Sequence, residues 1–224
     1  MFIDKSMTRE VVTVGPETGI VEAHELMTKN GIRHLPVVVE DDILIGILTD
    51  RDIRSAMPST LLSVTEKEAG QERLASMKVK DIMTPNPVSV SPTDTLEDAL
   101  LMMQKWKVGA FPVVDEHGRL KGMISVRDLM RAFVNVLGLE DPGALIGIIV
   151  EDKLGQMKKV VDAITELRVS FGSILVARTW EEGKRAIFPY LLTNNIAKVK
   201  NRLRELGFTL LEPMEWYLDS VPKK

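Results

Sequence analysis

The sequence predicts an α+β protein built from three modules, two of which are copies of each other. The prediction rests on a repeat at a fixed offset, on apolar positions at helical spacing within each copy, and on a different element order afterwards. Residues 4–54 align with 80–130 without a gap, and 16 of these 51 positions are identical. The offset follows from Gly46 and Gly122, since 122 − 46 = 76. The repeat therefore indicates a duplicated module.

Each copy is predicted to have the order β-α-β-β-α. A Val-rich run opens it, and in copy two Asp94 and Glu97 have the spacing of a helix N-cap and its N3 partner. The predicted strands are 11–14, 35–39 and 44–48 in copy one, and 88–90, 111–114 and 120–124 in copy two. The closing helices are expected to begin near Asp50 and Val126.

The C-terminal part has another order of elements. Strand-like runs at 145–150, 174–177, 186–192 and 208–211 alternate with two helical patterns, and the second helix ends at Gly207, a typical C-cap residue. The order β-α-β-β-α-β is that of a ferredoxin-like split β-α-β fold. The expected bounds are 1–57 and 78–135 for the copies, 58–77 for a linker helix, 136–144 for a second linker, 145–212 for the third module and 213–224 for a C-terminal tail.

Composition excludes several classes of function. The net charge of −3 provides no basic field for a nucleic acid, and no apolar run approaches the length of a membrane span. The chain has no cysteine, and its three histidines lack metal-ligand spacing, so no metal site is expected. Phosphate-loop, dinucleotide and nucleophile-elbow motifs are missing as well. We therefore expect a cytoplasmic protein that is not an enzyme, with neither nucleic-acid nor membrane partners.

The segments 46–52 and 122–128 contain the most informative motif. Each places a hydroxyl, Thr49 or Ser125, at a strand-to-helix junction, with Asp52 or Asp128 three residues later. A helix N-terminus suits a phosphate, and a carboxylate can accept hydrogen bonds from ribose hydroxyls. The alternative is that the hydroxyls are N-caps and the carboxylates merely favour the first helical turn. The residues alone leave both interpretations open.

The paired modules resemble a tandem cystathionine-β-synthase (CBS) domain pair. The motif at 46–52 and 122–128 matches the family's Gly-hydrophobic-x-Thr/Ser-x-x-Asp pattern, and 34–38 and 110–114 match its second hallmark. The resemblance implies an adenosine ligand (AMP, ADP, ATP or S-adenosylmethionine) in clefts between the copies, and no other cofactor. It implies contacts from Thr49, Asp52, Ser125 and Asp128, and an adenine wall formed by backbone up to Leu35 in copy one and around Ala110 and Phe111 in copy two.

The two copies differ beside this motif. Copy one has Arg33 and His34 where copy two has Gly109 and Ala110. In related pairs basic side chains here reach ligand phosphates, so the cleft of copy one is expected to favour the more anionic ligand. Arg51 and Arg127 are further candidate phosphate contacts, because arginine suits phosphate geometry. The alternative is that Arg33 and His34 are solvated surface groups. Trp106, near a helix end, is expected at an interface or in a lid.

The third module resembles an ACT domain. Residues 152–157 stand where that family has Asp-x-Pro-Gly-x-Leu, with Leu154 in place of the proline. The resemblance implies either a ligand loop for an amino acid at Asp152, Leu154, Gly155 and Gln156, or a dimerisation module without a ligand. A CBS pair followed by an ACT domain is similar to the acetoin-utilisation AcuB-type proteins.

Together these features predict a regulatory sensor that binds an adenine nucleotide. A homodimer is expected, and an unidentified regulated protein would be its partner. Two other classes remain open. One is a structural interaction subunit with clefts that bind nothing, which regulates a partner enzyme or transporter. The other is an enzyme whose active site has no recognised motif.

Overall fold

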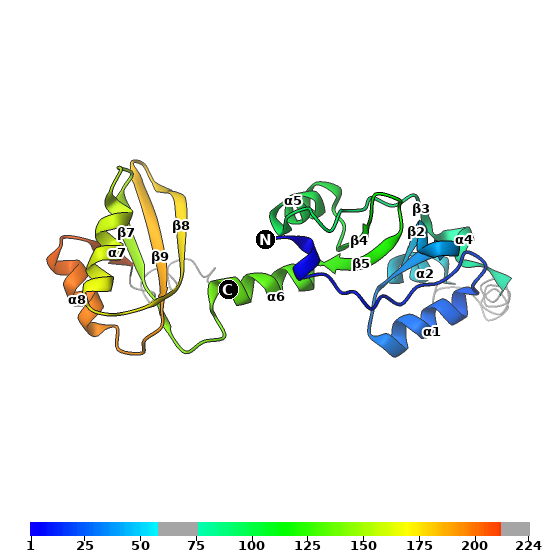
Figure 1. Ribbon diagram of the computed structural model, residues 1–224, viewed down its shortest axis with the longest axis horizontal. Coiled ribbons are helices and arrows are strands. Elements are labelled where there is room, and N and C mark those ends of the chain that lie inside the picture. Colours follow the sequence, from blue (N-terminus) through cyan, green and yellow to red (C-terminus); the bar gives the residue numbers. More distant parts are fainter. Residues whose placement is uncertain (58–75, 212–224) are drawn as a thin grey trace, which may run out of the picture. The chain divides into compact units, whose positions relative to one another are not determined.

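The computed structural model describes residues 1–57 and 76–211 (Figure 1). Most of the predicted linker helix at 58–77 and the predicted tail at 213–224 lie outside these residues. The chain divides into two compact units, Met1–Met130 and Arg131–Lys224. No helix in the described ranges is both long and apolar enough to cross a membrane.

The first unit contains both copies of the repeat, and each has the predicted helix-strand-strand-helix core. Copy one consists of α1 (Ile20–Asn30), β1 (His34–Val39), the short 3-10 turn η2 (Glu40–Asp42), β2 (Ile43–Thr49) and α2 (Asp50–Ala56). Copy two consists of α5 (Leu96–Trp106), β4 (Ala110–Val114), β5 (Leu120–Ser125) and α6 (Val126–Leu137), and α6 continues into the second unit. The two strands of each copy pair antiparallel.

The predicted first strand of each copy is reduced to a single bridge. Val14 pairs in parallel with Val37, and Val90 pairs with Val113. The prolines of β1 and β4 explain the short pairing. Val14 N–H donates to Pro36 O, but Pro36 has no N–H to continue the ladder, and Val90 meets Pro112 in the same way.

The segment before each copy packs on the other copy, which the repeat alone did not predict. The helix α4 (Val79–Ile82) and strand β3 (Thr84–Pro85) precede copy two, yet β3 pairs with β2 of copy one. The equivalent 3-10 helix η1 (Ile3–Lys5) precedes copy one, and Ile3 N–H donates to Asp94 O of copy two. Thr8 then pairs with Met123. The copies therefore exchange their first segments.

The segment that leads into copy two completes the core of copy one. Its strand β3 pairs with β2, and its helix α4 contributes a buried residue. Leu48, at the end of β2, is fully buried in this core, and so is Val79 of α4. The core consists of Val14, Ile20, Ala23, Met27, Leu35, Val37, Leu48, Ile53 and Val79.

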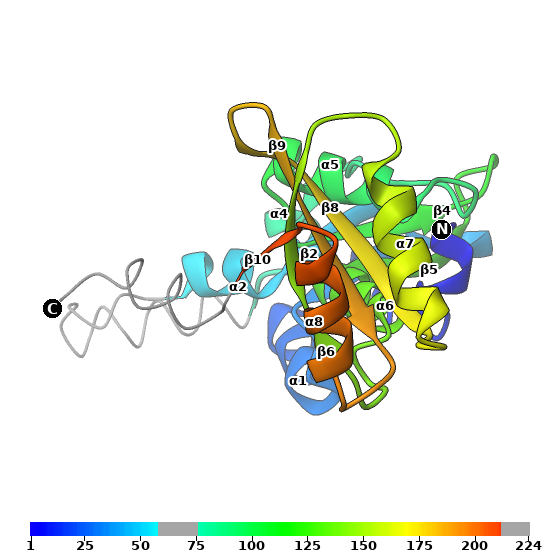
Figure 2. The same cartoon turned by 90° about the vertical axis from the view of Figure 1, so that its left-hand side faces the viewer.

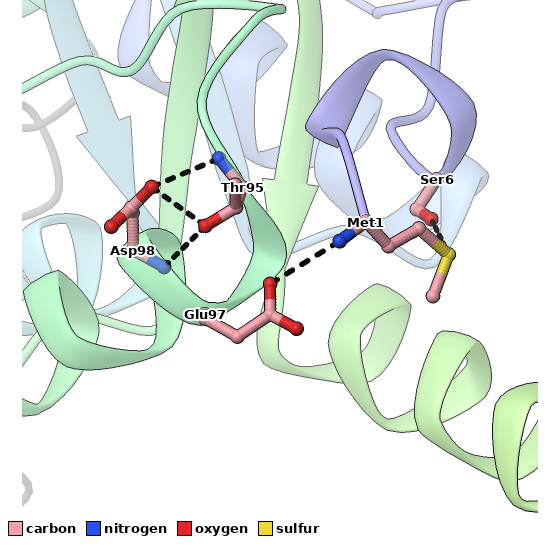
Figure 3. Close-up of polar contacts among 5 residues, drawn as sticks. All are labelled: Met1, Ser6, Thr95, Glu97 and Asp98. Atoms are coloured by element: carbon pink, nitrogen blue, oxygen red, sulfur yellow. Dashed lines mark hydrogen bonds and ion pairs between the residues drawn. The ribbon is translucent and has the colours of Figure 1, made fainter.

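The N-terminus of α5 differs from the sequence prediction by one residue. Thr95 is the N-cap and Asp98 its N3 partner, not Asp94 and Glu97 (Figure 3). Thr95 Oγ1 donates to Asp98 Oδ2 at 2.6 Å and accepts from Asp98 N–H at 3.1 Å. Asp94 accepts instead from Ser91 N–H at 2.8 Å, in the turn that leads to the helix. Glu97 lies 3.4 Å from the Met1 amine. Thr95 is the N-cap residue because its hydroxyl can both donate a hydrogen bond to Asp98 and accept one from it.

The second unit has the predicted order β-α-β-β-α-β. Its elements are β6 (Ala144–Leu145), β7 (Gly147–Glu151), α7 (Gln156–Glu166), β8 (Phe171–Glu181), β9 (Lys184–Leu191), α8 (Ala197–Glu205) and β10 (Thr209–Leu211). The strand order in the sheet is β10-β7-β9-β8. The short strand β6 pairs with β9 on the same edge as β7 and in the same register. Helices α7 and α8 lie together over one face (Figures 1 and 2).

The core of the second unit is separate from that of the first. It lies between the sheet and the two helices. Its buried residues are Ile146, Ile148, Val150, Val160, Ala163, Ile164, Ile187, Leu191, Val199 and Leu203.

The predicted linker at 136–144 is packed against the second unit. Ser173 Oγ of β8 donates to Leu137 O at 2.9 Å, and Tyr190 Oη of β9 donates to Asp141 O at 2.6 Å. A Cβ on Gly143 would lie 2.5 Å from Leu191 O, so only glycine fits this approach. The segment is therefore held by the sheet and does not act as a free linker.

Candidate functional site

The repeated motif forms a capping box in both copies. Thr49 donates from its N–H and its hydroxyl to Asp52 Oδ2, at 2.8 and 2.6 Å, and Thr49 Oγ1 accepts from Asp52 N–H at 3.3 Å. Ser125 and Asp128 make the same three bonds, at 2.9, 2.6 and 3.3 Å. The N-cap interpretation is therefore confirmed in both copies. The box uses Oδ2 of Asp52, and Asp52 also lines the pocket described next.

A pocket of about 480 Å³ opens beside the capping box of copy one. Copy two supplies its opposite wall, and Gly109 lies so close that a Cβ there would be 3.8 Å from the His34 ring. The volume is within the range of small-molecule sites, about 300–1,000 Å³. The lining residues are Arg33, His34, Ile47, Thr49, Asp50, Arg51, Asp52, Arg54, Thr84, Pro87, Val88 and the segment from Trp106 to Pro112.

The structure brings together seven of the residues predicted for nucleotide binding. They are Arg33, His34, Thr49, Arg51, Asp52, Ala110 and Phe111.

Four other predicted residues do not line this pocket. The side chain of Leu35 is fully buried in the core of copy one. The expected contact of its backbone with an adenine stays a prediction. Ser125, Arg127 and Asp128 belong to the equivalent position of copy two, where Asp128 is 8% exposed.

His34 is partly buried at the pocket wall. Burial lowers the pKa of His34, the Arg33 guanidinium lowers it further, and the Asp52 carboxylate opposes both effects. The neutral imidazole is therefore favoured in the pocket without a ligand. A phosphate placed here would shift the balance towards the imidazolium, because a nearby anion stabilises the charged form.

The pocket has an excess of positive charge. Arg54 is engaged, because its Nη2 lies 2.7 Å from Asp50 Oδ2. Arg33, Arg51 and Lys107 form no ion pair with any residue in the described ranges. The three cations share the pocket with Asp52 as the remaining carboxylate. This electrostatic balance suits a small anion.

Several lining residues were not predicted as ligand contacts. Thr84, Pro87 and Val88 enter through the exchange of first segments, which local periodicity does not encode. Trp106 was expected at an interface or in a lid, and it lies at the pocket with 52% of its side chain exposed. Lys107 had a signal in the sequence, since it replaces Gly31 of copy one.

The predicted ligand loop of the third module connects β7 to α7. Asp152 is paired with Arg185 through its Oδ1, 2.5 Å from Nε, so its charge is balanced by β9. Leu154 is fully exposed, and Gly155 has a φ of 89° at the N-terminus of α7, next to Gln156. The positive φ favours glycine at this position. Within the described ranges, no group of three or more acidic or histidine side chains is arranged to hold a metal.

The sequence repeat corresponds to a known domain. The family model of the CBS domain matches residues 3–59 and 79–135. The chain belongs to the CBS domain family. A CBS domain-containing protein of Dictyostelium discoideum is 34% identical over 137 residues, which cover 61% of this chain and 94% of that protein. An inosine-5'-monophosphate dehydrogenase of Korarchaeum cryptofilum is 38% identical over 121 residues, 54% of this chain but 22% of the enzyme.

Solved CBS pairs superpose on the same part of the chain. CBSX2 of Arabidopsis thaliana in complex with AMP has a TM-score of 0.52 and 27% identity, and covers 60% of this chain and 97% of its own. The pair of protein MJ0100, in complex with 5'-methylthioadenosine and S-adenosylmethionine, has a TM-score of 0.50, 26% identity and coverages of 59% and 95%. A candidate acetoin utilization protein (AcuB) from Vibrio cholerae has a TM-score of 0.52, 27% identity and coverages of 62% and 95%.

Proposed function

We propose that the chain is a non-catalytic regulatory protein whose CBS pair binds an adenine nucleotide. The observation that carries the proposal is the pocket at Asp52, which joins a candidate ribose acceptor, cations that form no ion pair within residues 1–57 and 76–211, and an apolar wall. The complexes of the relatives with AMP and with S-adenosylmethionine support an adenosine ligand. AMP, ADP, ATP and S-adenosylmethionine are the candidates, and no other cofactor is proposed.

The pocket residues fall into groups according to the part of the nucleotide that each would contact. Asp52 would accept from ribose hydroxyls through the oxygen that the capping box leaves out, while Thr49 holds that carboxylate in place. Arg33 and Arg51 would bind phosphate oxygens as charged donors. The apolar segment 108–111 would cover the adenine. At copy two, Ser125, Arg127 and Asp128 would form a second and less cationic site, because Arg33 and His34 have no basic counterparts there.

A regulatory mechanism follows from the composition of the pocket. Its walls come from both copies, so a ligand contacts both at once. If the copies have two relative arrangements, the ligand favours the one that binds it better. This change in arrangement would then be transmitted through a homodimer to a regulated partner protein. Acetoin utilisation is the pathway that similarity to AcuB suggests.

The second unit would be a ferredoxin-like ACT domain. Its sheet order, β10-β7-β9-β8, is the order 4-1-3-2 of the split β-α-β arrangement. It would either bind an amino acid at the loop 152–156 or hold a dimer together. Titration of the full chain with amino acids, and its mass in solution, separate these two roles.

Isothermal titration of the full chain with AMP, ADP, ATP and S-adenosylmethionine tests the nucleotide proposal. We expect saturable heat with at least one ligand, and Asp52→Ala should abolish the binding event at the pocket of copy one while leaving any binding at the site of copy two. This substitution also removes a helix cap, which costs about 1 kcal/mol of stability.

Asp98→Ala is the matched control for that loss. It removes a capping box of the same geometry from α5, outside the pocket (Figure 3). We expect it to lower the melting temperature but to leave binding unchanged. No heat with any of the four ligands at millimolar concentration would refute the proposal and favour the structural interaction subunit. Turnover of a nucleotide by the unsubstituted chain would instead favour an enzyme.

A further inference from the structure

Lys107 has a backbone conformation that lysine rarely adopts. It is the C-cap of α5, in the left-handed region at φ 54° and ψ 40°, and its N–H donates to Met103 O. The equivalent residue of copy one is Gly31, at φ 62° and ψ 30°, whose N–H donates to Met27 O. The two positions are therefore conformationally equivalent, and glycine is the residue that fits them without strain. A cation at a helix C-terminus is favourable, but the left-handed backbone makes lysine a more strained residue here than glycine.

Lys107 is one of the residues that line the pocket beside Asp52. It follows Trp106 on the wall contributed by copy two. Trp106 is oriented in part by Lys105, whose ammonium lies 5.7 Å from the indole centroid. The apolar segment 108–111 follows directly and forms the deeper part of the wall, where Phe111 is 1% exposed. An uncharged base suits this segment, which leaves the lysine at the charged end of a ligand.

Lys107 adds a cation from copy two to those of copy one. Arg33 precedes β1 and Arg51 lies in the first turn of α2, so both are held by the module that also holds Asp52. A monophosphate beside the ribose can be bound by these two arginines. A third cation, on the opposite wall, gains a partner when the ligand carries further phosphates, because each adds negative charge within reach of a flexible side chain.

We propose that Lys107 is a specificity-determining residue, which makes this pocket prefer a nucleoside di- or triphosphate over a monophosphate. The proposal rests on nucleotide binding at this pocket and assigns the preference to one residue that the duplicated module lacks at Gly31. The strained backbone is retained because the lysine binds phosphate from the wall opposite Asp52.

The test is isothermal titration of the full chain with adenosine, AMP, ADP and ATP. Lys107→Gly restores the residue of copy one, and Lys107→Met removes the charge but keeps the side-chain length. We expect either variant to weaken ATP binding about tenfold, which corresponds to the loss of one charge-assisted hydrogen bond, while the binding of adenosine and AMP stays unchanged. Equal weakening of AMP and ATP would contradict the proposed preference. The melting temperature of Lys107→Gly should not fall. Lys107→Arg should keep the preference for ATP.

Lys29→Met is the matched control, because it removes an exposed lysine from the last turn of α1, outside the pocket. Quenching of Trp106 fluorescence, absent in Trp106→Phe, locates the ligand at this wall. Equal weakening of adenosine and ATP, or unchanged ATP binding, in Lys107→Met would overturn the specificity proposal while nucleotide binding stands. If the unsubstituted chain binds none of the four ligands, the nucleotide function itself is overturned, and this proposal with it.

Discussion

Gly46 and Gly122 are glycines because each meets a methionine from the other copy. A Cβ on Gly46 would lie 2.5 Å from Met83 Sδ, and a Cβ on Gly122 would lie 2.7 Å from Met7 Sδ. The second site is tighter, since the Thr8 carbonyl oxygen would be 2.8 Å away and is held by the pairing of Thr8 with Met123. A methionine tail can turn aside, whereas a paired backbone carbonyl cannot.

We therefore predict graded costs for alanine at these glycines. Gly46→Ala should lower the free energy of unfolding by about 1–3 kcal/mol, as overpacking does, and Gly122→Ala should cost more. Gly19→Ala is the control, because nothing lies within 4 Å of a Cβ there. Urea denaturation measures all three. Equal stability of Gly46→Ala and Gly19→Ala would contradict the close approach of Met83.

His34 makes stability depend on pH. Because its pKa is lowered in the folded chain, the unfolded chain binds the proton more readily below the ordinary value of about 6.5. Stability is therefore present above that pH and is lost as the pH falls through the lowered pKa. We expect the melting temperature to fall less between pH 7 and pH 5 in His34→Gln than in the unsubstituted chain.

His117→Gln is the control for this prediction, since His117 is exposed in a turn of copy two. Observation of the His34 ring by proton NMR gives a direct check, with a midpoint below 6.5 without a ligand and an upward shift with ATP. A midpoint above 6.5 in the free chain would show that Asp52 outweighs burial and Arg33.

At the scale of elements, the exchanged segments decide how the copies form a pair. The strand β3 continues the sheet of copy one from the chain before copy two, and Thr8 does the same at Met123 of copy two. Each sheet therefore depends on a segment that the repeat assigns to the other copy. The exchange also brings Thr84 to the pocket of copy one.

Thr8→Pro should weaken copy two without direct effect on copy one. It removes the N–H that donates to Met123 O at 2.9 Å. We expect the Met123 amide, which donates to Thr8 O, to exchange hydrogen faster, while amides of β2 stay protected. Hydrogen exchange resolved by residue measures both strands in one sample. Equal acceleration in β2 and β5 would mean that the copies open together.

At the scale of the whole molecule, each of the two units has buried apolar residues of its own among the residues that the structure describes. Leu48 is buried in the core of copy one, and Ile148 is buried in the core of the second unit, each fully. The helix α6 belongs to both units by sequence, because the division falls within it. Each of these cores consists of residues from its own unit only.

Calorimetry of core variants tests whether the units unfold separately. Leu48→Ala and Ile148→Ala should each cost about 2–5 kcal/mol, as cavities in a core do. We expect two transitions, of which Leu48→Ala shifts one and Ile148→Ala shifts the other. A nucleotide should raise the transition that Leu48→Ala lowers. A single transition that moves equally in both variants would mean that the chain unfolds as one cooperative unit.

The sequence by itself determined the duplication, the element order of all three modules and seven residues of the pocket. Periodicity, caps and the fixed offset of 76 residues are enough to find the duplication and the element order, because these features are local or repeated. The pocket residues followed in part from the resemblance to the CBS family. It also identified the Thr49–Asp52 and Ser125–Asp128 pairs, although their dual role as cap and candidate contact needed the geometry of the oxygens.

Only the tertiary structure decided which segments complete each sheet and which wall faces Asp52. The parallel pairing on β1 and β4 is short because Pro36 and Pro112 lack an N–H, whereas chain from the other copy pairs with the neighbouring strands β2 and β5. The same long-range packing brought Lys107 into the pocket that Arg33 and Arg51 line. Sequence patterns do not encode these contacts, because they depend on how distant segments pack in space.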